Sequence, residues 1–336
     1  MMEPSSPEQQ GGESATESVA DETSGLARAE VRDWVDRILP VVVDGATRPL
    51  GADAVEHPEV AAAEVAGLRA RLSAAQSAGD TEMERGILTR LARVLAARGR
   101  DLAEAVGVGT QATALGDDPE LRVELAMWLE SLGDPAGAAT VLRDCVATAP
   151  SARDAARLLM RIGLLLVRAG DAAGAIEALT QSASIWPAFA APLEAAGSIA
   201  AMCGRDDASP MLMQAAERQE AAGDRAGSFE TRRRAVEASP SDERATATLA
   251  TLLDRAGRTA AADQVLRERA ALAEPAVARQ IHVERLRRGF ERGDAPGALL
   301  AVIDGALESV VEGEESALVD GVFDKTGLHD AIWIRQ

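Results

Sequence analysis

The chain has 336 residues, of which 47% are hydrophobic and only 2% aromatic, and its formal net charge is −19. Such an acidic chain is a poor ligand for nucleic acids and anionic membranes, because both select a basic footprint. Because aromatic residues are so few, Ala, Leu and Val must fill the core. Ala and Leu are strong helix formers, so we expect an all-α fold.

The negative charge is concentrated at the two ends of the chain. Residues 1–60 hold 13 acidic and 4 basic side chains, a net of −9, and residues 294–336 hold 9 and 2, a net of −7. Cys145 and Cys203 lie far apart, which is typical of a reducing compartment rather than of a disulfide framework. With no signal-like segment and no long apolar run, the sequence predicts a soluble, cytoplasmic protein.

Three segments are distinguished in chain order by their composition. Residues 1–24 are rich in Ser, Glu, Gln and Gly, so we expect a disordered acidic tail. Residues 25–58 predict an amphipathic helix, at about 25–39, followed by a linker. A helical repeat array is then predicted over 59–312.

Glycines that end apolar helical stretches recur along the array at a nearly constant interval. They are Gly79, Gly99, Gly133, Gly170, Gly204, Gly223, Gly257 and Gly293. Three prolines (Pro150, Pro187 and Pro240) each lie 17 residues after one of these glycines. Because Gly suits the position after a helix and Pro blocks a continuing one, the pattern predicts two-helix hairpins with a period of about 34 residues.

The clearest hairpin is predicted between about residues 154 and 187. Its first helix places Leu159 and Ile162 on one stripe, Gly170 and Asp171 make the turn, and Leu179 lies on the second helix. These features resemble the tetratricopeptide repeat (TPR) family: a large and then a small residue in the first helix, the Gly-Asp turn, and the closing Pro. The chain departs from that family by having Leu or Ala where aromatic residues are usual.

The resemblance covers roughly residues 60–310 and implies a right-handed α-solenoid of about six or seven antiparallel helical hairpins, a TPR-like superhelix. One interval is irregular, because Gly204 and Gly223 are only 19 residues apart. Either the helix between them serves two hairpins, which would be a phase slip and a sub-domain boundary, or Gly204 is a degenerate turn. Both alternatives stay open at this point.

Residues with catalytic or metal-binding potential are sparse and isolated. Gly107–Ala112 fits a GxGxxA dinucleotide fingerprint, but a helical pattern precedes it where that motif needs a strand. His57, His282 and His329 have no metal-ligand spacing, and we expect His57 and His282 to lie on the surface. Cys145 occupies a small-residue core position. The sequence therefore predicts no enzyme, no cofactor and no metal site.

Two arginine clusters suggest a partner-binding surface. One is Arg232–Arg234, and the other contains Arg285 and Arg288; we select Arg232, Arg233, Arg285 and Arg288 as candidate contacts for an acidic peptide or phosphate. The favoured alternative is pairing along the helix, such as Glu230 with Arg234 or Glu284 with Arg288. Lys325 is the only lysine, so the lysine-based carboxylate clamp of some TPR proteins is not supported.

Residues 313–336 predict an apolar helical segment that acts as a cap or a truncated repeat. They include Ile332, Trp333 and Ile334, and Trp333 is a further candidate contact. Such a patch would dock on the last repeat, be covered by a partner, or continue into further repeats.

The function that these patterns favour is a non-enzymatic scaffold or adaptor, which binds a partner's helix or peptide on the concave face of the solenoid. The alternative is a regulatory or sensor module that binds a small ligand or a signalling peptide.

Overall fold

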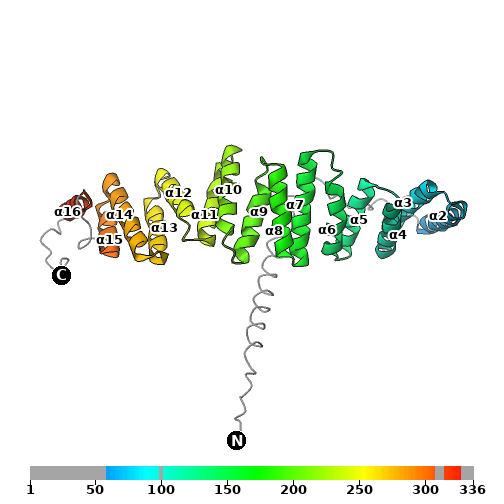
Figure 1. Cartoon of the computed structure of the whole chain (residues 1–336), viewed down its shortest axis with the longest axis horizontal. Helices are drawn as coiled ribbons and strands as arrows, with labels where there is room; N and C mark the ends of the chain where they lie inside the picture. The colour runs from blue at the N-terminus through cyan, green and yellow to red at the C-terminus, as the bar shows by residue number, and fades with distance from the viewer. Residues whose placement is uncertain (1–57, 98–100, 307–313, 327–336) are drawn as a thin grey trace, which may run out of the picture. The chain divides into compact units, whose positions relative to one another are not determined.

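The computed structural model describes residues 58–97, 101–306 and 314–326, and within these ranges every regular element is a helix (Figure 1). The helices are α2 (Pro58–Ala78), α3 (Thr81–Ala97), α4 (Leu102–Leu115), α5 (Pro119–Ser131), α6 (Pro135–Val146), α7 (Ala152–Ala169), α8 (Ala172–Ile185), α9 (Ala191–Met202), α10 (Ala208–Ala221), α11 (Arg225–Ala238), α12 (Glu243–Arg255), α13 (Thr259–Leu272), α14 (Pro275–Arg292), α15 (Ala295–Gly305) and α16 (Glu314–Thr326). Several predictions concern residues outside the described ranges: those for the tail 1–24, the segment 25–58 up to His57, the Gly99 turn, His329 and Trp333.

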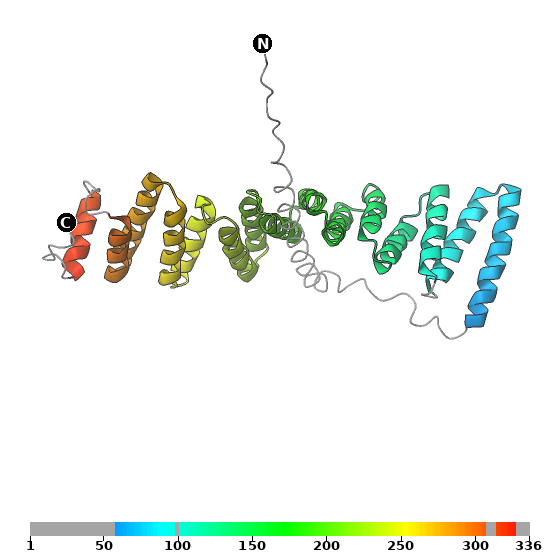
Figure 2. The same cartoon turned by 90° about the horizontal axis from the view of Figure 1, so that it is seen from below.

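The chain divides into two compact units, with the boundary between Cys203 and Gly204. Unit 1 contains α2–α9 and unit 2 contains α10–α16. Within each unit, every helix packs on the next helix along the chain, and Figure 2 shows these neighbours side by side. This nearest-neighbour packing confirms the predicted all-α solenoid of helical hairpins with a TPR-like fold. The unit boundary falls at the start of the short interval between Gly204 and Gly223.

Seven of the eight predicted turn glycines adopt a left-handed backbone conformation, and the eighth, Gly99, is outside the described residues. Their φ angles lie between 65° and 87°. At Gly170 the amide donates to the Val167 carbonyl at 2.9 Å, and the amide of Asp171 donates to the Leu166 carbonyl at 2.8 Å. Because the left-handed region is costly for a residue with a Cβ, glycine both ends the first helix and sets the direction of the second.

An aspartate directly after five of these glycines caps the following helix, and the first of them, Asp80, accepts from the Met83 amide at 3.0 Å. The carboxylates of Asp134, Asp171, Asp224 and Asp294 accept from the amides of Gly137, Gly174, Gly227 and Gly297, respectively, at 2.8–3.0 Å. A Cβ on any of these four glycines, whose amides donate to the caps, would lie 2.2–2.4 Å from the capping carboxylate. The recurring Gly-Asp-x-x-Gly sequence is therefore a turn and cap combined.

The hairpin α7–α8 shows how small residues bring the helices of unit 1 together. Gly163 lies so close to α8 that a Cβ there would be 2.6 Å from the Leu179 side chain. Leu179 itself is fully buried, and the buried Ser182 hydroxyl donates to the Ala156 carbonyl at 2.6 Å. Cys145 is also buried, and burial raises the pKa of its thiol, so its predicted packing role is confirmed.

The last described helix, α16, packs on α14 and α15 of unit 2. Val319, Val322 and Phe323 of α16 are buried in one cluster with Leu286 of α14. The Lys325 ammonium lies 3.8 Å from the centre of the Phe290 ring, a cation–π contact at the edge of this cluster. The described part of the C-terminal apolar segment is thus covered by the hairpin before it.

Candidate functional site

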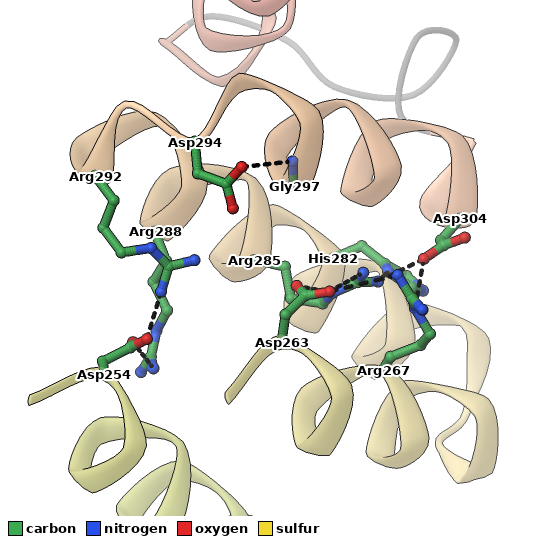
Figure 3. A network of polar contacts seen from close by, with 10 residues as sticks. All are labelled: Asp254, Asp263, Arg267, His282, Arg285, Arg288, Arg292, Asp294, Gly297 and Asp304. Atoms are coloured by element: carbon green, nitrogen blue, oxygen red, sulfur yellow. Dashed lines mark hydrogen bonds and ion pairs between the residues drawn. The ribbon is translucent and has the colours of Figure 1, made fainter. Parts of the chain in front are cut away.

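The second arginine cluster lies inside unit 2, where Arg285 joins three helices (Figure 3). Its side chain has no exposed area, and its guanidinium bonds to both carboxylate oxygens of Asp263 on α13, at 2.8 and 2.9 Å. A third bond, of 2.9 Å, reaches Asp304 on α15. Every guanidinium nitrogen is engaged, so Arg285 serves the packing of the hairpins and is not presented to a partner.

The prediction that His282 lies on the surface is wrong, because only 9% of this residue is exposed. Its Nδ1 lies 2.9 Å from Nη1 of Arg285, and since arginine can only donate, Nδ1 is the acceptor of a neutral ring. Burial, together with the nearby positive charge of Arg285, lowers the pKa of His282. Burial raises the pKa of Asp304, but the hydrogen bonds and positive charges of Arg285 and Arg267 together outweigh burial, so the pKa of Asp304 is lowered.

Arg288 of α14 is held by two acidic residues, one on its own helix and one on α12. Its Nε donates to Glu284 at 2.8 Å, which confirms the predicted pair four residues apart. Its Nη1 donates to Asp254 on α12 at 3.2 Å, and the same carboxylate accepts from Arg292 at 2.5 Å (Figure 3). Arg288 therefore ties the first helices of two successive hairpins together.

The first arginine cluster, on α11, separates into residues with different surroundings. Arg233 is exposed and pairs along its own helix with Glu230 and Glu237. Arg232 is buried, with 8% of its side chain exposed. Its Nη1 donates to the buried Ser228 hydroxyl at 2.6 Å, and its Nη2 donates to Glu220 at 2.5 Å. Its Nε is buried and has no acceptor.

Arg232 lines a pocket of about 360 Å³ that is formed by residues of α10, α11 and α12, and we call it the arginine pocket. The pocket is lined by Glu220, Arg232, Ala247, Thr248, Thr251, Leu252 and Arg255. Its charged lining consists of two arginines and one glutamate, so the lining carries a net positive charge in an acidic protein. Arg255 was not singled out in the sequence, because the other arginine of the pocket, Arg232, is 23 residues away and on another helix.

A larger groove, of about 480 Å³, lies in unit 1 between α5 and residues from the end of α6 to α7, and we call it the α5 groove. It is lined by Pro119, Glu120, Val123, Glu124, Met127, Cys145, Thr148, Ala149, Pro150 and Leu158. The sequence analysis missed it. The signal was nonetheless present, because Glu120, Val123, Glu124 and Met127 follow helical spacing on the face of α5 that turns away from buried Leu125.

The described residues contain no group of three or more His, Cys, Asp or Glu side chains that could hold a metal ion. The Gly107–Ala112 segment lies within α4, where Gly109 allows close packing against Leu125 and Trp128. The preceding element is α3, a helix, so this segment lacks the strand that a dinucleotide-binding loop needs. No helix in the described ranges is long and apolar enough to cross a bilayer.

Comparison with known proteins gives likenesses to solved helical-repeat structures. A tetratricopeptide repeat protein from Parabacteroides merdae is 15% identical, with a TM-score of 0.33 over 90% of this chain and 99% of that chain. PilF from Pseudomonas aeruginosa is 14% identical, with a TM-score of 0.25 over 72% of this chain and 98% of that chain. The human IFIT1 dimer is 15% identical, with a TM-score of 0.25 over 91% and 77%.

No protein-family model and no curated protein matches the sequence. Because the TM-scores lie below 0.5, the assignment of a TPR-like fold depends on the helices, turns and caps described above. That fold is usually non-catalytic and typically serves protein–protein interaction.

Proposed function

We propose that this protein is a non-enzymatic scaffold or adaptor, and that the α5 groove in unit 1 holds a helix or extended peptide of a partner protein. The observation that carries this proposal is the groove itself. It exposes Val123, Met127 and Leu158 to a ligand, on the first helices of two successive hairpins. An amphipathic helix or an extended peptide with apolar anchors suits such a surface.

The acidic side chains of the groove suggest the chemistry of the peptide. Glu120 is exposed at its edge, and Glu124 pairs with Arg93 of α3 at 2.8 Å. A partner segment with an apolar anchor and a neighbouring Lys or Arg would therefore match both the groove and the negative charge of the chain. We also propose that the protein meets this partner in the cytoplasm.

Site-specific photo-crosslinking tests the proposal directly. A photo-reactive amino acid replaces Met127 in the full chain, and crosslinking is carried out in the cells that produce the protein. The matched control carries the same amino acid at Thr140, which is exposed on α6 and outside the groove. We expect a discrete adduct from position 127 that is absent from position 140. Adducts of equal pattern at both positions, or none at 127, would contradict a role for the groove.

The alternative, a sensor module for a small ligand, is favoured by one observation. The arginine pocket has a net positive lining and a volume within the range of small-molecule sites. A free anion that binds there as tightly as a peptide would support this alternative, and the titration described next includes that comparison.

A further inference from the structure

We propose that the arginine pocket of unit 2 binds a carboxylate of an acidic partner peptide, and that Glu220 occupies the position of that carboxylate until the peptide displaces it. This site lies in a different unit from the α5 groove and adds a second, oppositely charged contact for a partner. The inference rests on the proposed scaffold function. It assigns an anion-binding role to Arg232 and Arg255.

Arg232 supplies a guanidinium that is fixed in place before any ligand arrives. Its side chain is 8% exposed and its Nη1 is anchored on the buried Ser228 hydroxyl at 2.6 Å. Its buried Nε has no acceptor, so the hydrogen bonds of this cation are incompletely satisfied by the protein. A buried cation with incomplete compensation favours an additional anion nearby.

Glu220 is a replaceable partner for Arg232. The side chain of Glu220 is 54% exposed, although its carboxylate accepts from Arg232 at 2.5 Å. That hydrogen bond, followed by the charges of Arg232, Arg225 and Arg255, lowers the pKa of Glu220, so it is ionised at neutral pH. A carboxylate from a partner would repeat the same charge-assisted bond, while Glu220 would be rehydrated on moving into solvent.

Arg255 gives the pocket a second positive charge. It lies at the end of α12, and it makes no hydrogen bond or ion pair with any residue that the structure describes. Its side chain is therefore available to a ligand. Two arginines on neighbouring helices would hold a carboxylate from two directions, and one of them is already immobilised.

The two threonines of the pocket favour a peptide over an inorganic anion. The Thr248 hydroxyl donates to the Arg244 carbonyl at 2.7 Å, and the Thr251 hydroxyl donates to the Ala247 carbonyl at 2.8 Å. With their hydrogens engaged, both oxygens face a ligand as acceptors only. An acidic peptide presents backbone N–H donors beside its carboxylates, and it can also contact the apolar Ala247 and Leu252 of the lining, which an inorganic anion cannot.

The test is a titration of the full chain at low ionic strength, followed by the fluorescence anisotropy of a dye-labelled tetraglutamate peptide. The reference probe is tetraglutamine with the same dye, and inorganic phosphate serves as a competitor. We expect tetraglutamate to bind and tetraglutamine not to bind. The variant Glu220→Gln should bind tetraglutamate about fivefold more tightly, because the internal competitor loses its charge.

The variant Arg255→Gln should bind about fivefold more weakly, since the unpaired cation is lost. Its matched control is Arg244→Gln, which removes an exposed arginine of the same helix that is already paired with Glu217. Equal affinities of Arg255→Gln and Arg244→Gln would overturn the proposal, as would equal binding of the two peptides. Phosphate that competes as strongly as free tetraglutamate would overturn the assignment to a peptide. If tetraglutamate does not bind, the arginine pocket proposal fails, but a crosslink from Met127 would still support the α5 groove. The two proposals can therefore fail separately.

Discussion

The hairpin α7–α8 of unit 1 and the helices α13–α15 of unit 2 are held together by different kinds of contact. In the first, Gly163 allows Leu179 to approach the α7 backbone, and the contact consists of apolar side chains of well-defined volume. In the second, Arg285 fills the space between three helices and is neutralised by Asp263 and Asp304. The turn and the aspartate cap that introduce α8 and α15 are nevertheless the same.

This difference shows that the hairpin geometry is set at the turns, while the interfaces between helices are free to be apolar or charged. An apolar interface depends on volume, because a close-packed interior cannot absorb an added methyl group without moving. A buried ionic interface depends on charge balance, because removal of one member leaves the others uncompensated. The two units should therefore respond to different substitutions.

The largest effect is expected from Arg285→Ala in unit 2. Asp263 and Asp304 would then lose the cation that is buried between them and keep only the 38% exposed Arg267 as a shared partner, at a cost of about 3 kcal/mol in the free energy of unfolding. Urea unfolding followed by helical circular dichroism measures the loss, and hydrogen exchange should place it in α13–α15.

The matched control for Arg285 is Arg287→Ala, which removes an arginine of the same helix that is 50% exposed and paired with Glu284. We expect this control to change the free energy of unfolding by less than about 1 kcal/mol. Similar losses for the two variants would mean that the network contributes nothing beyond an exposed ion pair.

In unit 1, Gly163→Ala should destabilise the protein although alanine is the better helix former. The added Cβ would lie 2.6 Å from the Leu179 side chain and 3.3 Å from the Ala175 carbonyl oxygen, and such overpacking costs about 1–3 kcal/mol. Gly86→Ala in α3 is the control with the opposite sign, because no atom lies within 4 Å of its Cβ position. That control should gain up to about 1 kcal/mol. A stabilised Gly163→Ala would contradict close contact between α7 and α8.

The turns and the helices between them could be predicted from the sequence, because their signals are local. Gly170 and Asp171, for example, are adjacent, and each acts on the backbone beside it. The interfaces could not be predicted in the same way. Arg285 meets Asp263 and Asp304 from positions 22 and 19 residues away, so its burial depends on how three helices are rotated about their axes.

The candidate sites were only partly predictable for the same reason. Arg232 was selected as a charged cluster residue, but its burial and its neighbour Arg255 depend on the packing of α11 on α12. The spacing on α5 was readable in the sequence, whereas the contribution of Leu158 to the groove required the placement of α7.

A smaller effect, of about 1 kcal/mol, is expected where a cap is missing. Arg258 precedes α13 but makes no side-chain capping bond, whereas Asp242 before α12 accepts from the Ala245 amide at 3.1 Å. Arg258→Asp should supply the same bond to α13 and raise the free energy of unfolding relative to Arg258→Ala. Thermal and urea unfolding of the two variants provide the comparison, and equal stabilities would show that this helix end needs no cap.

The smallest effect is a pH dependence confined to the ionic interface of unit 2. Because the folded chain lowers the pKa of His282 below its ordinary value of 6.5, the unfolded chain takes up the proton first as the pH falls. The contribution of the neutral ring is thus complete above pH 6.5 and is lost as the pH falls toward the lowered pKa. We expect the wild type to lose stability relative to His282→Asn between about pH 8 and about pH 5, since asparagine can accept from Arg285 without titrating. His57 and His329 are present in both proteins, so their titration cancels. If the free energy of unfolding changes with pH in the same way for the wild type and His282→Asn, then His282 is protonated without opposition from Arg285.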